Sequence, residues 1–596
     1  MIRSFVRGAA LAVLACAAVP AQINADGPAI SPFRGMRKVD QGIEVQVLDD
    51  TWYRLESVAG VDTATLLQEA RRLCRPGNDW KRITEDLPAL LDAMGHEVGT
   101  DVDVRVRSLQ NGKLRTFEDV RMTGENRRRV KEAQRGGRRG AAPAVANRRG
   151  GTITAAAARE DLQVFHKLLA ERFAYRELRP VDLDGLLRRI GAELPDDGLP
   201  VERFAAQLDG VLRAFGDGHS RLRGSVGRNE RWLPFLIQQV DGGYAAFASD
   251  RDGFVSERHP FVQAIDGVPI ERWLLAARER VTRGSEVMQR GQSERLLRNL
   301  SELRRALSLP DRDAVAVTLR GESGEHRVEL EASRRKPMFG AWPRKATAVL
   351  DGNVGYLRIE RMEGDEASLR FLDQAMQNFR GTKGLVIDVR GNGGGRRDPL
   401  RRLAPYFLPE GEAVVGNVAA FLLEEGKPAP PDALANRYLY RADWDGWNDR
   451  QRVAIGAFLR GFRPSWKLPK GRFSPWHFLV LDRSDNEMAF HYDRPVVVLI
   501  DRGCFSATDI FAGALQAIDT VTVVGERSAG GSGRARGYQL PNSGVRLQLS
   551  TMASFRPDGT LYEGHGVAPD VEVVTRATDL IGRTDTALAR ALELLR

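Results

Sequence analysis

Cysteine and histidine are scarce in this chain, with 3 and 8 copies among 596 residues. So few cysteines exclude a disulfide framework, and no group of cysteines and histidines has the spacing of a zinc site. The glycine-rich turns lack both the Gly-Lys-Ser/Thr ending of a phosphate loop and the spacing of a dinucleotide-binding loop. We therefore expect neither a metal ion nor a cofactor.

Long apolar runs are also missing, apart from one near the amino terminus. Within residues 1–21, arginines precede an apolar run at 9–19 and small residues follow at 19–21, the pattern of a signal peptide. No later segment approaches the roughly 20 apolar residues that a membrane-spanning helix needs. We expect export to a periplasmic or extracellular compartment, with lipid attachment at Cys16 as the alternative.

Positive charge exceeds negative charge, with 89 Lys and Arg against 79 Asp and Glu. Part of the excess lies at 126–151, where arginines and glycines give the composition of a flexible linker. No aromatic residue is interleaved with these arginines, so we expect no nucleic-acid partner. Contact of the linker with an anionic membrane surface stays open.

The linker divides an N-terminal domain, 26–125, from the rest of the chain. Strand-like stretches at 43–48 and 102–106 and a helical stretch from Thr63 to Cys74 predict an α+β domain of unknown role. Cys74 lies in this domain and Cys504 lies near the other end of the chain, so we do not expect a disulfide between them.

After the linker, apolar residues recur at helical spacing within 162–173 and 204–215. This pattern predicts a helical segment over 152–222. The second helix ends directly before the turn Gly216-Asp217-Gly218-His219.

A β-rich unit follows over 223–335. Residues 261–270 predict a strand, a turn and a second strand, and a helix follows at 271–281. The stretches 315–319 and 326–330 would complete the unit as a hairpin.

The most informative stretch is 494–515. Its apolar run 495–500 has the pattern of a strand buried on both faces in a parallel sheet. Polar residues 501–503 end the strand, and a helix is predicted from Ser506 onward. A serine at this place, beside unpaired helix amides, is either a nucleophile facing an anion site or an N-cap. Cys504 is expected to pack beside this elbow as a small apolar group.

A second turn, rich in glycine, also follows a buried strand. The buried strand Gly384–Asp388 is followed by Arg390, Gly391 and Asn392, and then by three consecutive glycines, 393–395. Glycines leave backbone amides free to point at an oxyanion, because no side chain obstructs them.

These motifs resemble those of the C-terminal-processing, or tail-specific, serine peptidases, to which the tricorn core protease is related. The matching motifs follow one another in the family's order: Asp388–Gly395, Cys504–Thr508, Gly525–Gly531 and Glu563–Asp570. The resemblance implies a ClpP/crotonase-like catalytic domain over 346–596, with Ser506 as its nucleophile.

The branches of this family differ in their general base. The processing-protease branch has a lysine where this chain has Gly531, so a Ser-Lys dyad is not available there. The tricorn-like branch takes its base from a histidine after an upstream helix, which corresponds to His219. An imidazole with a pKa of about 6.5 can take a serine proton and return it to the leaving amine. The resemblance also implies that Glu563 is the supporting carboxylate.

His565 is the main rival of His219, because it lies two residues past Glu563. If that stretch is extended, both side chains point to one face and His565 can approach the same pocket. The serine that precedes the histidine in the tricorn pattern is replaced here by a glycine, and Ser220 and Ser528 are candidates for its hydroxyl.

The resemblance places one oxyanion-hole amide at Ala507 and the other at Gly393 or Gly394, without ranking the two glycines. It also identifies the unit at 223–335 as a PDZ-like module, which either adds a peptide to an open strand edge or only braces the catalytic domain. The region at about 410–490 departs from the family pattern and carries four of the 9 tryptophans, as a cap, a partner surface or the core of an insertion.

The sequence therefore predicts an α/β fold with a ClpP/crotonase-like catalytic domain, a PDZ-like β-rich module, a helical segment and an N-terminal α+β domain. The predicted function is an exported serine peptidase that cleaves unfolded proteins or C-terminal tails through an acyl-enzyme. A non-catalytic peptide- or ligand-binding protein and an acyl-CoA enzyme of the crotonase type are the alternatives. Neither needs Ser506, His219 and Glu563 together.

Overall fold

The computed structural model describes residues 30–39, 42–49, 51–73, 79–85, 87–96, 99–127, 129–130, 151–223, 230–340, 342–424, 426, 429–430 and 432–596. The chain forms two compact units, which divide between Ala144 and Val145. The predicted signal peptide, Cys74 and most of the predicted linker lie outside the described residues. No helix in the described part of the chain is both long and apolar enough to cross a lipid bilayer.

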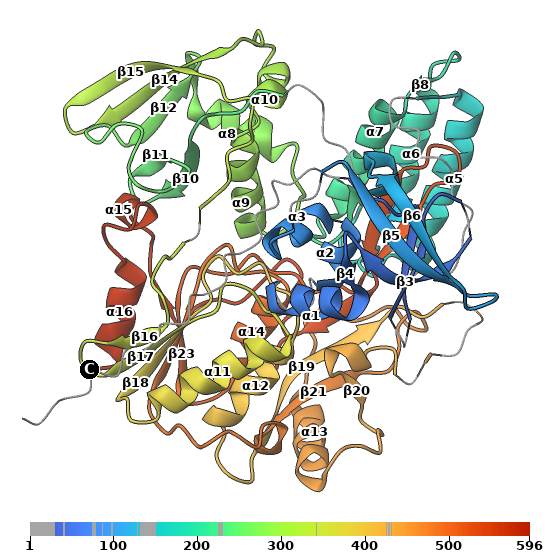
Figure 1. Cartoon of the computed structure of the whole chain (residues 1–596). Helices are drawn as coiled ribbons and strands as arrows, with labels where there is room; N and C mark the ends of the chain where they lie inside the picture. Colours follow the sequence, from blue (N-terminus) through green and yellow to red (C-terminus); the bar gives the residue numbers. More distant parts are fainter. Residues whose placement is uncertain are drawn as a thin grey trace, which may run out of the picture. The chain divides into compact units, whose positions relative to one another are not determined.

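The first unit (blue in Figure 1) has an antiparallel sheet with helices packed against it. The strands lie in the order β1 (Gly35–Val39), β2 (Gly42–Gln46), β3 (Tyr53–Val58), β5 (Asp101–Ser108) and β6 (Leu114–Arg121), and β4 (Val61–Asp62) pairs with β3. The helices are α1 (Thr63–Leu73), α2 (Asp79–Glu85) and α3 (Leu87–Ala93). In β5, Val102, Val104 and Val106 are buried between exposed residues, so one strand face lies in the core. The predicted strands and helix are confirmed.

The second unit begins with helices. They are α5 (Ala155–Arg172), α6 (Leu183–Ala192) and α7 (Val201–Phe215), with the short pair β7 (Thr152–Ile153) and β8 (Leu199–Pro200). α7 ends because Gly216 adopts the left-handed conformation, with φ 72°. This glycine turns the chain toward His219, as the sequence predicted.

A β-rich module comes next. Its sheet has the order β10 (Leu236–Val240), β11 (Gly243–Phe247), β12 (Phe261–Ile265), β14 (Ala314–Gly321) and β15 (Gly324–Glu331), and β13 (Val268–Pro269) pairs with β12. The helices α8 (Ile270–Arg278), α9 (Glu286–Leu297) and α10 (Leu300–Ala306) complete it. The predicted strand-turn-strand, helix and hairpin are confirmed.

A mainly parallel sheet forms the centre of the C-terminal half. Its order is β16 (Ala348–Leu350), β17 (Val354–Arg358), β18 (Gly384–Asp388), β22 (Val496–Ile500), β23 (Val521–Gly525) and β27 (Val571–Glu572), with only the β16–β17 pair antiparallel. The helices beside it are α11 (Glu366–Phe379), α12 (Asp398–Phe407), α14 (Ala507–Leu515) and α16 (Thr586–Leu594), whereas α15 (Ala577–Leu580) packs against β10 and β11 of the module.

Helices cover both faces of this sheet. In β22, Val496, Val498 and Ile500 share a core with α11, α12 and α14, whereas Val497 and Leu499 pack with α16. Figure 1 shows α16 (red) and α11 (yellow) on opposite sides of β17 and β18. Burial on both faces explains why the predicted strand is continuously apolar.

The region 410–490 is joined to the core through a second sheet. Its order is β20 (Tyr440–Arg441), β21 (His477–Asp482), β19 (Ala413–Phe421) and β26 (Met552–Phe555), with the helix α13 (Asp449–Gly461) and the short helices η1 (Ala435–Arg437) and η2 (Arg483–Asp485). Trp447, Trp466 and Trp476 pack in the core that this sheet shares with α5 and α7. These tryptophans therefore have a packing role.

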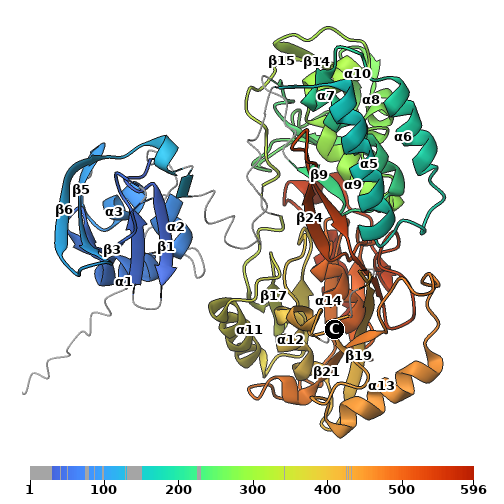
Figure 2. The same ribbon diagram turned by 90° about the vertical axis from the view of Figure 1, so that its right-hand side faces the viewer.

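A third sheet joins distant parts of the chain. It consists of β24 (Ala535–Gln539), β25 (Arg546–Ser550) and β9 (Arg221–Arg223), all antiparallel. Figure 2 shows β9 and β24 in the same region although the sequence separates them widely. The residue that leads into β9 is His219, two positions before the strand, so this sheet brings the predicted base toward the C-terminal half.

Candidate active site

Ser506 lies at a tight turn between β22 and α14. Its φ and ψ are 63° and −115°, a conformation that residues with a side chain rarely adopt. The backbone N–H of Ser506 donates to Asp509 Oδ2 at 2.7 Å, which holds the turn in place. The elbow presents a partly exposed hydroxyl at the positive end of a helix.

Asp509 links this elbow to the glycine-containing segment that follows β23. The buried carboxylate accepts hydrogen bonds from Ser528 Oγ at 2.5 Å and from the backbone amides of Gly530 and Gly531. Burial raises the pKa of Asp509 to about 7, and these donors act in the opposite direction. Ser528, a candidate accessory hydroxyl in the sequence, is thus bound to Asp509.

His219 contacts Ser506 directly. Its Nε2 lies 3.1 Å from Ser506 Oγ, and its ring stacks on Phe505 with ring centroids 4.5 Å apart. A serine in place of Gly218, as in the tricorn pattern, would require Met288 and Phe505 to shift, because a Cβ there would lie 2.7 Å from Met288 Cε and 2.9 Å from Phe505 Cζ. The predicted nucleophile and base are therefore within hydrogen-bond distance.

The β9–β25 pairing holds His219 in this place. Arg221 lies opposite Gln548 in the register of the two strands. The side chain of Gln548 also donates through Nε2 to the backbone carbonyl of His219 at 2.6 Å. Sequence reasoning found the helix that leads to His219 but not this partner, which is far away in the chain.

Asp217 is a site residue that sequence reasoning missed. It is fully buried, Oδ1 accepts the backbone N–H of His219 at 3.0 Å, and Oδ2 accepts the hydroxyl of Ser220. Ser220, the other candidate accessory hydroxyl, therefore supports Asp217. An aspartate between two glycines just before the candidate base was the available signal.

Glu563 lies beside Asp217, with carboxylate oxygens of the two residues within 4.8 Å of each other, and its Oε1 accepts the backbone N–H of Gly218 at 3.4 Å. Burial raises the pKa of Glu563 well above its usual value, the charge of Asp217 adds to this effect, and Arg179 opposes it. No hydrogen bond joins Glu563 to the imidazole, although ligand atoms of the two residues lie within 4.8 Å of each other. Within the described residues, the buried Oε2 of Glu563 and the buried Nδ1 of His219 both have no hydrogen-bond partner. Two carboxyl groups therefore lie next to the imidazole.

Asp217, His219 and Glu563 could together also hold a metal ion, which the sequence did not predict. A ring nitrogen of His219 and carboxylate oxygens of Asp217 and Glu563 all lie within 4.8 Å of one another. However, both Asp217 oxygens accept hydrogen bonds, Nε2 of His219 faces Ser506, and burial raises the pKa of Glu563 well above its usual value, which favours its protonated form. These contacts fit an acid–base assembly better than a cation site, because a cation needs deprotonated ligands.

The stretch around Glu563 is not extended, so the condition under which His565 would share its face is not met. Gly564 and Gly566 have φ of 84° and 62°, and the amide of His565 donates to Tyr562 O at 3.2 Å, so the chain turns here. Glu563 is buried, whereas His565 is exposed. The turn removes the reason for placing both side chains on one face.

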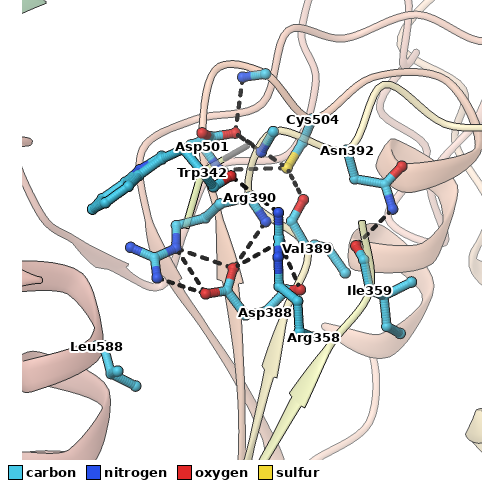
Figure 3. Close-up of polar contacts among 12 residues, drawn as sticks. Trp342, Arg358, Ile359, Asp388, Val389, Arg390, Asn392, Asp501, Cys504 and Leu588 are labelled. Atoms are coloured by element: carbon cyan, nitrogen blue, oxygen red, sulfur yellow. Dashed lines mark hydrogen bonds and ion pairs between the residues drawn. The ribbon is translucent and has the colours of Figure 1, made fainter. Parts of the chain in front are cut away.

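A buried ionic cluster anchors the glycine turn after β18 (Figure 3). Asp388 accepts the Tyr356 hydroxyl at 2.8 Å and the backbone N–H of Arg390 at 3.0 Å, and Arg390 also bonds Asp585 at 2.8 Å. Burial alone would raise the pKa of Asp388, but Arg390 and Arg358 hold it below its usual value. The turn is thus fixed at its first residues.

Asn392 and Cys504 connect this turn to the elbow. The carbonyl of Asn392 accepts the amide of Phe505 at 3.2 Å, and its Oδ1 accepts the Thr508 hydroxyl at 2.9 Å. Cys504 is fully buried, as predicted, and its thiol donates to Val389 O at 3.1 Å. Figure 3 shows Cys504 pointing toward Val389.

The structure separates the two glycines that the sequence left unranked. Gly394 packs so closely on the elbow that a Cβ there would lie 2.8 Å from Ser506 Cβ and 2.9 Å from Ala507 N. Its own amide donates to Asn392 Oδ1 at 2.9 Å. Gly393 is exposed, with open space around its Cβ position. Of the two glycines, Gly393 therefore remains the better candidate for an oxyanion-hole amide, together with the predicted amide of Ala507.

The sequence predicts that the module either adds a peptide to an open strand edge or only braces the catalytic domain. Its edge strand β10 gives evidence on this choice. The backbone N–H of Gln239 in β10 donates to Glu294 Oε1 at 2.9 Å, and the carbonyl of Gln239 accepts from Arg502 Nη2 at 2.5 Å. Glu294 and Arg502 also form an ion pair at 2.8 Å. At this position the edge is already occupied, and Arg502 ties the module to the turn that leads to Ser506.

Comparison with known proteins gives a consistent set of matches. Residues 353–573 match the model of Peptidase family S41. A Carboxy-terminal-processing protease of Bartonella bacilliformis is 37% identical over 259 residues, which cover 39% of this chain and 56% of that protein. A "Probable CtpA-like serine protease" of Staphylococcus aureus is 23% identical over 260 residues, or 44% of this chain and 40% of its own length. The chain thus spans about half of these relatives or less.

Among solved structures, mature CPAF has a similar fold, with a TM-score of 0.53 at 17% identity over 74% of this chain and 96% of that chain. Its complex with lactacystin gives a TM-score of 0.52 at the same identity. At this identity the likeness concerns the fold, which is mixed α/β with several sheets.

Proposed function

Since residues 353–573 match Peptidase family S41, we propose that this chain is a serine peptidase that cleaves unfolded proteins or protein C-terminal tails through an acyl-enzyme. One observation carries the proposal. The Oγ of Ser506, on its conformationally constrained elbow, lies 3.1 Å from Nε2 of His219. Nucleophile and base at this separation are what acyl transfer requires.

The steps follow from the geometry. Neutral His219 removes the proton from Ser506 Oγ as that oxygen attacks the peptide carbonyl carbon. The amides of Gly393 and Ala507 stabilise the oxyanion, and losing one such donor typically costs about 3 kcal/mol of transition-state stabilisation. The imidazolium then gives its proton to the leaving amine. Water, deprotonated by His219 in turn, hydrolyses the ester.

The Asp217–Glu563 pair balances the charge that forms on His219. Both carboxyl groups are buried beside the imidazole, where one negative charge stabilises the imidazolium. Both oxygens of Asp217 accept hydrogen bonds, whereas Oε2 of Glu563 has no partner among the described residues, so we place this charge mainly on Asp217. The sequence prediction instead places it on Glu563.

We expect Asp217→Asn to lower turnover by about 10²-fold or more, and Glu563→Gln to lower it less, with little change in KM for either. The amides keep the shapes of the acids, and only the first removes the main charge. Steady-state kinetics on one fluorogenic peptide measures both. A larger loss in Glu563→Gln than in Asp217→Asn would return the charge to Glu563.

Burial lowers the pKa of His219 from 6.5 to about 4; the charge of Asp217 opposes this effect, and the charge of Arg437 adds to it. The base must be neutral to act, so activity should rise with pH through an apparent pKa well below 6.5. An unperturbed imidazole would place this limb near pH 6.5. Because a lowered histidine pKa also destabilises the fold as pH falls below 6.5, circular dichroism must accompany the rate profile. A limb at or above pH 6.5 would contradict the lowered pKa.

Export through residues 1–21, and lipid attachment at Cys16 as its alternative, stay proposals. The PDZ-like assignment of the module is also a proposal, and the occupied edge at Gln239 supports a bracing role. The experiment for the function is incubation with one protein substrate in folded and in reduced, unfolded form. We expect new amino termini from the unfolded form, and none from either form would overturn the proposal.

A further inference from the structure

Arg397 lies near the candidate site and has no carboxylate partner among the described residues. It lies two residues after Gly395 and is the N-cap of α12, with 5% of its surface exposed. Its Nη1 donates to the backbone carbonyl of Arg437 at 3.3 Å, and within the described residues its buried Nη2 has no hydrogen-bond partner. Burial and the charge of Arg437 lower the pKa of Arg397 to about 9, with no carboxylate opposing them.

Among the described residues, Arg437 likewise has no carboxylate partner. It ends η1 and is partly exposed, and its buried Nε has no hydrogen-bond partner in the described part of the chain. Burial lowers its pKa, and the charge of Arg536 adds to this effect. The charge of Arg437 also reaches His219, where it opposes protonation of the imidazole. Arg437 is therefore close both to Arg397 and to the candidate base.

The chain segment before β24 adds further arginines to this group. A Cβ on Gly533 would lie only 3.3 Å from His219 Cβ, so this segment runs along the site. Arg534 and Arg536 follow it. Burial lowers the pKa of Arg534 to about 10, and the charges of Arg536 and Arg437 add to this effect.

Acidic groups nearby do not neutralise these arginines. Glu424, whose charge reaches Arg534, forms an ion pair with Arg172 at 3.0 Å. Asp398 bonds Arg396 at 2.8 Å and the hydroxyl of Tyr438 at 2.5 Å. Among the described residues, no carboxylate forms an ion pair with Arg397, Arg437, Arg534 or Arg536, so positive charge from separate chain segments lies near His219 without a carboxylate paired to it.

Partly buried guanidinium groups without a carboxylate are costly for a folded protein, and their planar donors match the two oxygens of a carboxylate. Resting on the proposed function, we propose that Arg397 and Arg437, with Arg536 at the rim, form a subsite for a carboxylate of the substrate. The preferred substrates are then peptides with an acidic side chain or a free C-terminal carboxylate close to the cleaved bond.

Binding to the Ser506→Ala protein tests this subsite without requiring turnover. The probes are unstructured peptides in which one Asp is moved residue by residue, each with an Asn twin, and each made with a free or an amidated C-terminus. We expect at least one acidic peptide to bind about 10-fold more tightly than its neutral twin, with the ratio falling as salt is raised. Comparing each Asp peptide with its Asn twin, and each free C-terminus with its amide, shows which carboxylate is recognised.

Arg437→Gln should bring this ratio close to 1, and Arg437→Glu should invert it. Arg590→Gln, which removes the same charge from an exposed position on α16, should leave the ratio unchanged. Thermal unfolding of each variant checks that it is folded. Equal binding of every acidic peptide and its twin would overturn the subsite. Preferential binding by a wild-type protein that cleaves none of these peptides would keep the subsite and overturn the proposed peptidase.

Discussion

Ser506→Ala is expected to abolish peptide hydrolysis while leaving the thermal unfolding midpoint nearly unchanged. The substitution removes the atom that attacks the substrate, so the loss should reach several orders of magnitude in turnover. It removes one partly exposed hydroxyl and its bond to His219 and leaves the neighbouring core intact. Release of new amino termini from an unfolded protein measures the activity, and calorimetry measures the midpoint.

Ser323→Ala is the matched control, because this serine lies in the β14–β15 turn and its hydroxyl contacts His259. It should retain wild-type activity. Full activity in Ser506→Ala would remove Ser506 from the mechanism, and with it the proposed acyl-enzyme.

His219→Ala is expected to lower turnover by about 10²- to 10⁴-fold, because one imidazole serves as both base and acid. His565→Ala should remain close to wild type, since His565 is exposed and its Nδ1 lies 3.3 Å from the backbone carbonyl of Glu563. The two variants therefore form a matched pair, compared by kcat on one peptide. The reverse order of effects would show that His565 is the base.

The chain segments that carry the candidate site were predictable because their signals are local. The apolar run before Ser506 marks a strand buried on both faces, and β22 has that position. The helical spacing before His219 marks α7, and Gly216 ends it in the left-handed conformation that glycine allows. These patterns depend on neighbouring residues, so the sequence displays them.

Other features depend on partners far away in the chain. The contact of Gln548 with the carbonyl of His219 requires the β9–β25 pairing, which no local pattern encodes. The pairing of Asp217 with Glu563 likewise appears only when the turn after α7 meets the turn after β26. An aspartate in a glycine turn gave a signal for Asp217, but not the identity of its partner.

The stretch around Glu563 shows how glycine can reverse a prediction. Alternation of side chains was assumed there, yet Gly564 and Gly566 both adopt positive φ and fold the stretch into a turn. Two glycines spaced by one residue are better taken as turn formers. For Gly393 and Gly394, only the side chain of Asn392 distinguishes the two amides.

The ion pair between Arg502 and Glu294 gives the module a physical connection to the elbow. Arg502 has an exposed fraction of 9%, and it bonds both the module and Glu526 after β23. Residues of the module, through Met288, also approach the turn that holds His219. The module is therefore packed against both segments that supply the candidate nucleophile and base.

Labelling with a fluorophosphonate probe, followed by mass-spectrometric mapping of the modified residue, tests the central claim most directly. The probe reports an activated serine without any knowledge of the substrate. We predict one modified residue, Ser506, with labelling lost in Ser506→Ala and strongly slowed in His219→Ala. Labelling of another serine, or no labelling of the folded wild-type protein, would contradict the account.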